Sequence, residues 1–471
     1  MVARIVAEAY QKQRRRVRGR GSKLAVLGGT KGGTKRRGIM FLTNPRRGAA
    51  RSGLEVASNA MKTDVAAATR VNRSRFSSTL LYGAIWLLGL VVVQVGTATR
   101  AAANSFYIDS SGSDTNSGRS PSSPWKTLAR INSTALGPGD TVYLKRGSLW
   151  RETLIVNGSG AAGAPITITA YGVGALPAIS GANVVTGWAA YSNSVYATPL
   201  REKPSNVYLD NEPGWGMNQA GSQSSMSPDS WYWDGSKLFV NLADGSDPSR
   251  HTIEAAVRDK AVSADNRSYI VIDSLRTLRT GCWAISMISQ NASRNVGSKI
   301  TDNVITQNGT NLLDTGRYCN AIYINYATSP TVEGNTVSYA GGHNAINVQK
   351  ATDIRILNND VSEWNHNGLD TKMSQGIVYM GNRAHDAPHG NGIYSEQSAD
   401  ITAENNTIYN IGGSTNGNSN GVHFEPCKGR IVISGNSISN TYGGIYLRSQ
   451  AIVDNNSVNT RSGESISRRL P

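Results

Sequence analysis

One short pattern recurs along the second half of the chain: an asparagine, a polar residue and then an aliphatic residue. Successive copies start 32, 24, 23, 24, 30 and 20 residues apart. The starts are Asn303, Asn335, Asn359, Asn382, Asn406, Asn436 and Asn456, of which Asn382-Arg383-Ala384 is the least regular copy. A period in this range indicates a solenoid, in which each repeat buries its apolar face against the next repeat.

The residues between the asparagines identify the kind of solenoid. Apolar and polar residues alternate in short runs such as 354–356 and 431–433, and this period of two is typical of strands. No stretch of ten residues with helical spacing separates the repeats. We therefore predict an all-β fold in which each coil contains about three short strands that stack on the equivalent strands of the next coil.

The asparagines have a structural interpretation in such a coil. Asparagine tolerates the left-handed backbone of a sharp corner, and its amide can bond to its copy one coil away. A second asparagine column precedes another strand of each coil: Asn320, Asn344, Asn367, Asn391 and Asn420. We interpret both columns as structural ladders.

The net charge of +16 is concentrated at the N-terminus. Residues 1–103 carry 20 lysines and arginines against 3 acidic residues, whereas the rest of the chain carries 28 against 29. The folded part is therefore nearly neutral, and a groove for phosphates has no support there. We expect no nucleic-acid partner.

Residues 80–96 form an uncharged apolar run, preceded by arginines and followed by three alanines, as in a secretory signal. The run is nearly long enough to span a bilayer, so an uncleaved anchor is the alternative. We assign 1–76 to a basic extension that is disordered or reflects a start upstream of the true one at Met61. We assign 77–103 to the signal peptide or anchor. The expected location is extracellular or periplasmic, with residues 80–96 as the one membrane attachment.

The rest of the chain divides where the pattern changes. Residues 104–180 are expected to hold an N-terminal capping helix and the first coils, because an uncovered strand edge recruits other chains. Residues 181–260 interrupt the repeat with many aromatic residues and are interpreted as an inserted β-rich lobe. Residues 261–460 supply the remaining coils, and 461–471 form a polar tail. We expect a monomer.

Four segments resemble the opening of secreted bacterial right-handed parallel β-helix proteins of the pectate-lyase-like superfamily. This group includes polysaccharide lyases, alginate lyases and epimerases, and β-helical xylosidases. The resemblance covers roughly 104–460 and implies the fold, but leaves the reaction open because these enzymes differ in site chemistry. The segments are YIDSSGSDTNSG, PWKTLARIN, LGPGDTVYLKRGSLWRETL and ITAYGVGALPAISG.

The strand after the second asparagine column can be aligned across six coils. The segments are AIYIN (321–325), AINVQ (345–349), GLDTK (368–372), GIYSE (392–396), GVHFE (421–425) and GIYLR (444–448). Their second and fourth residues are mostly apolar and should point inward, so the third and fifth should point outward. One outward column is Tyr323, Asn347, Asp370, Tyr394, His423 and Tyr446; the other is Asn325, Gln349, Lys372, Glu396, Glu425 and Arg448.

These columns predict a groove for an extracellular polysaccharide, with an ordinary exposed sheet as the alternative. Tyrosine rings stack on sugars, and carboxylates and cations supply acid–base chemistry. The candidate catalytic residues are Asp370, Lys372, Tyr394, Glu396, His423 and Glu425. The candidate substrate-binding residues are Tyr323, Asn347, Gln349, Tyr446 and Arg448.

The spacing of the carboxylates bears on the reaction. Neighbouring coils lie roughly 4.8 Å apart, so Glu396 and Glu425 should have carboxyls about 5 Å apart, as in a retaining glycosidase. Asp370 and Glu396 should be roughly 8 Å apart, nearer the inverting range. Their separation along the chain also resembles the catalytic pair of the β-helical xylosidases.

A lyase needs a cation to neutralise a uronate and a base to remove a proton. Lys372 is the candidate neutraliser, and His423 or Tyr394 the candidate base. The leading hypothesis is a polysaccharide lyase that cleaves a uronate-containing polymer by β-elimination. The alternatives are a glycoside hydrolase using Glu396 with Asp370 or Glu425, a mannuronan-epimerase-like enzyme, and a carbohydrate-binding solenoid without catalysis.

Metal chemistry has limited support. The calcium-binding aspartates of the pectate-lyase relatives correspond to residues 366–370, where only Asp370 is retained. We expect no required cofactor, with Ca²⁺ as the one ion left open. Residues 386–389 partly resemble the Asp-Pro-His-Asp motif of mannuronan epimerases, with a loop turn as the alternative.

The cysteines and two histidines raise a further metal hypothesis. Cys319, His343 and His366 share one coil position, which is either a stack of corner residues or a site for a soft metal; we assign no metal ligand. Three cysteines, the others being Cys282 and Cys427, argue against a disulfide framework, but one bridge could form outside the cell.

Overall fold

The computed structural model describes residues 102–309, 318–413 and 419–469. The chain falls into two units, Met1–Ala98 and Thr99–Pro471, and all described residues belong to the second. The predicted extension and almost all of the predicted signal segment lie outside the described residues. Within the described ranges, no helix is long and apolar enough to cross a membrane.

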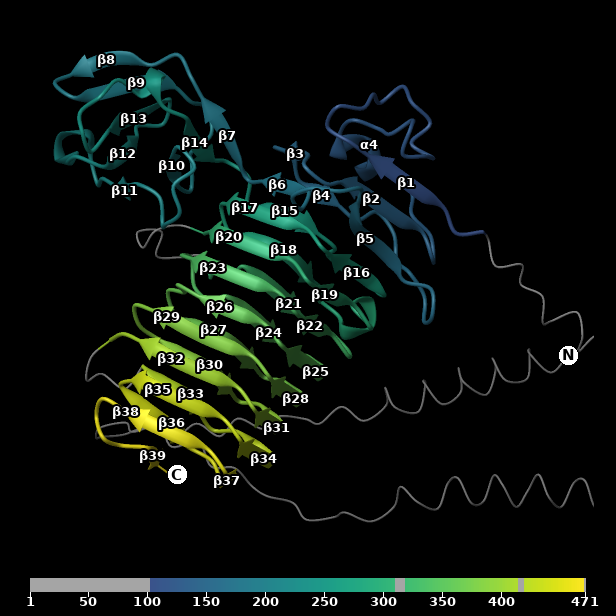
Figure 1. Ribbon diagram of the computed structural model, residues 1–471, viewed down its shortest axis with the longest axis vertical. Coiled ribbons are helices and arrows are strands. Elements are labelled where there is room, and N and C mark those ends of the chain that lie inside the picture. The colour runs from purple at the N-terminus through teal and green to yellow at the C-terminus, as the bar shows by residue number, and fades with distance from the viewer. Residues whose placement is uncertain (1–101, 310–317, 414–418, 470–471) are drawn as a thin grey trace, which may run out of the picture. The chain divides into compact units, whose positions relative to one another are not determined.

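Most strands belong to three parallel sheets, which we name A, B and C. The chain visits the sheets in turn, so one coil contributes one strand to each, and equivalent strands of successive coils pair in parallel. Figure 1 shows the coils as a stack of rungs that runs to the C-terminus. The predicted all-β parallel β-helix is confirmed.

The sheets are as follows. Sheet A holds β1 (Ser105–Ile108), β2 (Thr141–Lys145), β5 (Ile166–Tyr171), β16 (Ile270–Asp273), β19 (Lys299–Thr301), β22 (Thr331–Glu333), β25 (Thr352–Leu357), β28 (Gln375–Met380), β31 (Ala399–Glu404), β34 (Lys428–Ser434) and β37 (Ile452–Asp454). Sheet B holds β3 (Leu149–Trp150), β6 (Ala178–Ser180), β17 (Arg276–Thr280), β20 (Val304–Asn308), β23 (Thr336–Ala340), β26 (Asp360–Ser362), β29 (Arg383–Ala387), β32 (Thr407–Ile411), β35 (Ser437–Thr441) and β38 (Ser457–Thr460). Sheet C holds β4 (Leu154–Ile155), β15 (Lys260–Ser263), β18 (Trp283–Ile288), β21 (Ile322–Asn325), β24 (Ile346–Gln349), β27 (Asn367–Lys372), β30 (Asn391–Glu396), β33 (Asn420–Phe424), β36 (Gly443–Leu447) and β39 (Ile466–Arg468).

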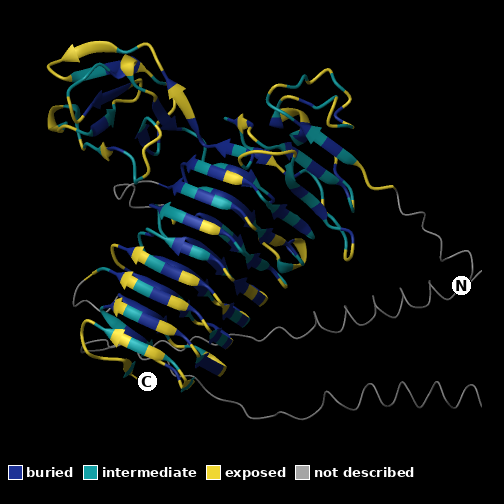
Figure 2. Ribbon diagram, viewed as in Figure 1, coloured by how far each residue is buried: buried dark blue, intermediate teal, exposed yellow. Residues whose placement is uncertain are grey.

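The core runs along the inside of the coils. In sheet A, Ile272, Ile300, Val332 and Ile356 pair in register and are fully buried. Figure 2 shows the resulting alternation of buried and more exposed residues along the rungs. Burying one such side chain stabilises the fold by about 1.5–3 kcal/mol, and a register slip of one residue would expose the whole column.

The first asparagine ladder is confirmed. The backbone N–H and the Nδ2 of Asn303 both donate to Oδ1 of Asn335, at 3.1 and 3.0 Å. The same pair of bonds joins every following member of the column through Asn456. Each of these amides is buried or half-buried, so the ladder satisfies polar groups that would otherwise destabilise the corner.

The expected left-handed backbone lies one residue earlier than we predicted. The ladder asparagines do not have positive φ; the residues just before them do, with φ between 52° and 67°. These residues are Asp302, Gly334, Asn358, Gly381, Asn405, Gly435 and Asn455. Glycine, asparagine and aspartate are the types that accept this conformation at least cost, so the corner and the ladder are made by two adjacent residues.

The second asparagine column is also a ladder. The backbone N–H of Asn344, Asn367, Asn391 and Asn420 each donates to Oδ1 of the preceding member, at 3.0–3.3 Å. This ladder lies at the start of the sheet C strands, immediately before the predicted groove.

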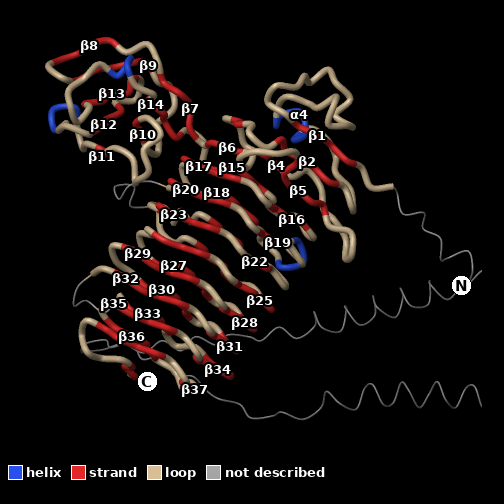
Figure 3. The backbone as a smooth tube through the Cα atoms, viewed as in Figure 1, coloured by secondary structure: helices blue, strands red, loops and turns tan. Residues whose placement is uncertain are grey.

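An inserted β-rich lobe interrupts the coils between β6 and β15. It contains a three-stranded antiparallel sheet and a five-stranded mixed sheet. The first sheet has β10 (Val207–Leu209), β14 (Ile253–Ala256) and β7 (Ala182–Val185); the second has β11 (Asn218–Gln219), β12 (Ser230–Trp233), β13 (Lys237–Asn241), β9 (Val195–Pro199) and β8 (Ala189–Ser192). Figure 3 shows it as a separate group of short strands and loops beside β17.

Helices are few and short in the part of the chain that the structure describes. One α-helix, α4 (Leu128–Asn132), lies within the segment where a capping helix was expected, and its Leu128 and Ile131 are buried. Its Asn132 accepts a hydrogen bond from the Ile155 backbone and donates one to Thr153 O, both at the first strand of sheet C. Its role as a cap stays a prediction. The 3₁₀ turns among the described residues are η2 (Gln223–Ser225), η3 (Pro248–Arg250) and η4 (Ala292–Arg294).

Two of the three cysteines form a disulfide bridge. Cys282 and Cys319 are bonded to each other across 37 residues of sequence, and Cys427 is a half-buried free thiol. The single bridge that the sequence allowed is therefore present, and Cys319 cannot act as a metal ligand.

Candidate active site

The predicted register of the sheet C face is confirmed. Tyr323, Asn347, Asp370, Tyr394, His423 and Tyr446 pair in one column. Asn325, Gln349, Lys372 and Glu396 pair in the neighbouring column, which Glu425 and Arg448 continue through backbone hydrogen bonds to Ser395 and Phe424. The alternate residues of these strands point inward as expected.

The first column is less exposed than we predicted. Asp370 and Asn347 have no exposed surface, and His423 retains only 4% of its own. The reason is lateral packing, because longer side chains of the second column and the rings of the first cover the shorter ones. Lys372, Glu396 and Glu425 keep 22–32% of their side-chain surface.

Asp370 is a buried carboxylate held by two amides. Asn347 Nδ2 donates to its Oδ1 and Asn367 Nδ2 donates to its Oδ2, both at 2.8 Å. Burial raises the pKa of Asp370 to about 6, although the Lys372 charge and the amide bonds oppose the rise. A carboxyl group that titrates near neutrality is suited to proton transfer.

The second ladder fixes one of these amides. Oδ1 of Asn367 accepts from the Nδ2 of Asn391, so its own amide nitrogen is turned toward Asp370. The same nitrogen lies 2.8 Å from Nδ1 of His366. From the sequence we assigned Asn367 to the ladder alone and missed its hydrogen bond to Asp370. The available signal was its position three residues before that aspartate.

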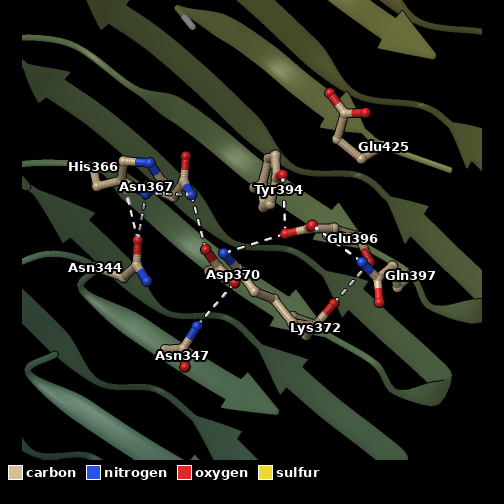
Figure 4. Close-up of polar contacts among 12 residues, drawn as sticks. Asn344, Asn347, His366, Asn367, Asp370, Lys372, Tyr394, Glu396, Gln397 and Glu425 are labelled. Carbon is tan, nitrogen blue, oxygen red and sulfur yellow. Dashed lines mark hydrogen bonds and ion pairs between the residues drawn. The ribbon is translucent and has the colours of Figure 1, made fainter. Parts of the chain in front are cut away.

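Glu396 lies on the next coil and faces the same place. One of its oxygens, Oε2, is 3.3 Å from Lys372 Nζ and 3.3 Å from the Tyr394 hydroxyl, which donates to it. Figure 4 shows Lys372 extending back so that its ammonium group lies beside Asp370. Burial and the nearby charge of Glu396 raise the pKa of Tyr394, so its hydroxyl stays protonated.

A second group forms one coil further on. His423 Nε2 lies 3.0 Å from one oxygen of Glu425, and Arg448 Nη1 donates to the other oxygen at 3.1 Å. Burial lowers the pKa of His423, partly offset by its bond to Glu425. Figure 4 shows the Glu425 carboxylate directed away from Glu396, so the structure does not join these two glutamates into a pair.

Aromatic rings extend the face in both directions. Tyr394 meets His423 edge-on at 5.2 Å, and His423 packs on Tyr446 at 4.5 Å. Tyr323 stacks on Trp283 at 6.1 Å, and burial raises the pKa of Tyr323. Trp283 was missed because it precedes the aligned segments. Gln349 lies beside Lys372 in the column, three coils before Glu425.

Hydroxyl groups lie inside the coil beneath this face. Thr371 and Ser395 occupy inward positions that are apolar in other coils, and their oxygens are 2.9 Å apart. The buried hydroxyl of Tyr379 is 2.6 Å from Thr371 Oγ1 and donates to the backbone oxygen of Tyr394. This cluster satisfies its own polar groups and supports the strand that carries Tyr394.

The soft-metal alternative for Cys319, His343 and His366 is excluded, since Cys319 is in the disulfide. His343 and His366 stack on each other at 4.2 Å. Burial lowers the pKa of His343 to about 3 and of His366 to about 4, so both rings are neutral. Within the described ranges no group of three or more His, Cys, Asp or Glu side chains could hold a metal. The groups that face Asp370 are the amide nitrogens of Asn347 and Asn367 and the Lys372 ammonium, which cannot act as calcium ligands.

The epimerase-like segment lies away from this face. Asp386 belongs to β29 of sheet B, where His385 and Asn410 bond to its carboxylate at 2.7 Å each. It makes no contact with Asp370 or Glu396.

Comparisons with known proteins agree with the fold. The family described as "Right handed beta helix region" matches residues 320–467. The solved structure of XylC with xylose superposes with a TM-score of 0.55 at 18% identity, covering 74% of this chain and 69% of that one. A GH136 lacto-N-biosidase from Eubacterium ramulus gives a TM-score of 0.46 at 14% identity, covering 78% of this chain and 68% of that one.

One curated relative is similar in sequence over a short stretch. A lacto-N-biosidase of Bifidobacterium longum subsp. longum is 43% identical over 79 residues, which is 16% of this chain and 5% of that protein. The chain thus spans a small part of the length of that relative.

Proposed function

We propose that this chain, which has the right-handed parallel β-helix fold of the pectate-lyase-like superfamily, is a glycoside hydrolase that uses Asp370 and Glu396. One observation carries the proposal. Two carboxylates lie on neighbouring coils of one face in opposite environments, the first buried with its pKa raised to about 6 and the second half-exposed beside a lysine. Glycosidases divide acid and base roles between two such groups.

The environments of the two carboxylates indicate which is the acid and which is the base or nucleophile. Asp370 is the proton donor to the leaving oxygen, because burial favours its neutral form. Glu396, in contact with the Lys372 ammonium and the Tyr394 hydroxyl, is the carboxylate that attacks the anomeric carbon or activates a water. Asn347 and Asn367 fix the orientation of Asp370. A bound sugar must displace the Lys372 side chain, whose ammonium covers Asp370.

The other carboxylate pair is less suited to this chemistry. Glu425 is held by both Arg448 and His423, and its carboxylate points away from Glu396. An acid paired with arginine gives up the proton that a donor needs. Glu425, Arg448 and the aromatic rings are better placed to bind neighbouring sugar units.

One comparison favours hydrolysis, because the 79-residue match is to a lacto-N-biosidase. β-Elimination of a uronate polymer stays the alternative, and Lys372 is its neutralising cation. That cation is already paired with Glu396, and Tyr394 is not available as a base because its raised pKa keeps the hydroxyl protonated.

Product analysis separates the reactions. The chain is screened on neutral and uronate-containing polysaccharides in water enriched in heavy oxygen. Hydrolysis gives new reducing ends that carry the label, with no ultraviolet absorbance from unsaturated sugars. Unsaturated products would establish a lyase instead, and saturable binding of a polymer without new ends would establish a carbohydrate-binding solenoid.

The proposed substrate is an extracellular glycan, and the proposed location is outside the cell or in the periplasm. The basic, apolar N-terminal segment supports this assignment. Labelling of intact cells with an antibody against the coils, compared with the culture medium, distinguishes an anchored protein from a released one.

A further inference from the structure

A loop of the inserted lobe is held rigidly between β10 and β11. Gln307 Nε2 of sheet B donates to the backbone oxygens of Glu212 and Gly214, at 2.8 and 3.2 Å. Asn206 Nδ2 donates to Trp215 O at 2.6 Å, and Arg279 Nη2 donates to Asp210 O at 2.9 Å. Two side chains of sheet B and one residue just before β10 thus fix the backbone of an otherwise irregular segment, which is how preorganised binding loops are built.

The loop borders two hollows. One, of about 360 Å³, lies within the lobe, and its lining includes Tyr208, Glu212, Trp215, Asn218 and Asp229. The other, of about 380 Å³, lies over the start of sheet B, and Glu212 and Pro213 line both. Each is large enough for a sugar unit, since small-molecule sites begin at roughly 300 Å³.

The first hollow has the chemistry of a sugar site. Trp215 offers an indole ring, and its edge-on contact with Tyr339 at 5.8 Å fixes its orientation. Glu212 and Asp229 accept hydrogen bonds from hydroxyls, and Asn218 can donate and accept. Burial, with the charge of Glu212, raises the pKa of Asp229. The lining contains no lysine, arginine or histidine, so a uronate would be repelled.

One coil connects the wall of this hollow with the candidate active site. Tyr339, which contacts Trp215, lies in β23, and the next strand of the same coil, β24, carries Asn347. Asn347 in turn bonds to Asp370. A glycan that passes round this corner from sheet C to sheet B would reach Trp215.

We infer that the hollow between Trp215, Glu212 and Asp229 is a remote subsite that binds an uncharged glycosyl unit of the substrate. The inference deepens the proposed function, on which it depends only for the choice of a glycan as ligand. With this subsite, the substrate must be a chain of several sugar units, and neutral sugars should bind more tightly than uronates.

The test measures binding without cleavage. The full chain with Asp370→Asn is applied to an array of neutral and uronate-containing oligosaccharides, and the tightest neutral ligand is titrated by calorimetry. Adding Trp215→Ala should weaken its affinity about tenfold or more, whereas Trp215→Phe should recover part of the loss. Tyr191→Ala is the matched control, because Tyr191 is 52% exposed on the same lobe and lines neither hollow. The double change Glu212→Gln and Asp229→Asn should improve the binding of uronate oligosaccharides.

Two results would overturn the inference. The first is that no neutral oligosaccharide binds to the Asp370→Asn chain. The second is that adding Trp215→Ala leaves the affinity unchanged, as adding the control Tyr191→Ala does. Melting temperatures of all variants exclude unfolding as the cause of a loss. Failure of the proposed function gives a different outcome, namely Trp215-dependent binding with no cleavage by the unmodified chain.

Discussion

The same coils carry two clusters of histidine and carboxylate side chains, one on sheet B and one on sheet C. On sheet B, His385 has a carboxylate on each ring nitrogen, Asp360 and Asp386, both at 2.7 Å. On sheet C, Asp370 has only amides as direct partners. The aspartates of sheet B keep 40–47% of their side-chain surface, whereas Asp370 keeps none.

The difference lies in burial rather than in residue type. Hydrogen bonds from Asn410 and His385 outweigh burial at Asp386 and hold its pKa below the usual range. At Asp370 burial outweighs the amide bonds and raises the pKa. An exposed ion cluster of the sheet B kind is expected to contribute little to stability or catalysis. The comparison makes four predictions.

The largest effect is expected from Leu369→Asp. Leu369 is fully buried in the core beside Asp370, and a carboxylate there would have no amide to receive it. We expect loss of more than about 3 kcal/mol of stability, enough to unfold the adjacent coils. Thermal melting followed by circular dichroism checks this. A variant as stable as the unmodified chain would show that the strand can slip in register.

Glu396→Gln is expected to lower turnover by about 100-fold or more, the scale of a positioned acid or base. The substitution keeps the size of the side chain, so the melting temperature should stay nearly unchanged. Asp386→Asn on sheet B is the control, and we expect it to change turnover by less than about twofold. Equal losses in both variants would mean that the active face had been placed on the wrong sheet.

The pH dependence of stability should have opposite signs on the two faces. The folded pKa of Asp370, about 6, exceeds its ordinary value of 3.8, so its neutral form is favoured by folding. Stability from this group is therefore greatest below pH 4 and declines as the pH rises to 6, by at most about 3 kcal/mol. Asp386, whose pKa is lowered, stabilises the fold above its ordinary pKa, and that contribution is lost as the pH falls further.

Denaturant unfolding at several pH values checks both signs. The free energy of unfolding of Asp370→Asn is subtracted from that of the unmodified chain at each pH. The difference should fall as the pH rises from 4 to 6. The same difference for Asp386→Asn should be smaller and should rise with pH, at lower pH values. A flat Asp370 difference would show that the carboxyl is solvated.

The smallest effect is expected from removing residues 1–103. A shortened chain that begins at Asn104 should fold with the same melting temperature and the same activity, because the repeat and both clusters begin later. Insolubility of this chain, where the full chain is soluble, would contradict the assignment of that segment to targeting.

Local periodicity was sufficient to predict the coils. The alternation at residues such as Ile354 and Ile356, and the recurrence of Asn335 and Asn359, specify register because a slip would expose the core. The positive φ of Asn358 could not be placed to the residue, since both it and Asn359 are types that suit a corner.

The two residue columns of the candidate site were predictable, but the environment of each residue was not. The columns with Asp370 and Glu396 follow from strand register alone. The burial of Asp370, the disulfide of Cys282 and the inward hydroxyls around Tyr379 depend on which side chains meet across corners and coils. No spacing along the chain encodes those lateral contacts.

The asparagine ladders keep the coils aligned although the coils differ in length. Members of the first ladder are 20 to 32 residues apart, yet each pair makes the same two hydrogen bonds. In the two longest intervals of this ladder, the extra sequence lies between the strand of sheet B and the strand of sheet C, before Asn320 and before Asn420. Insertions and deletions there would leave the positions of Asp370 and Glu396 unchanged. Such a scaffold can gain or lose sequence beside the proposed active site while the proposed catalytic groups keep their alignment.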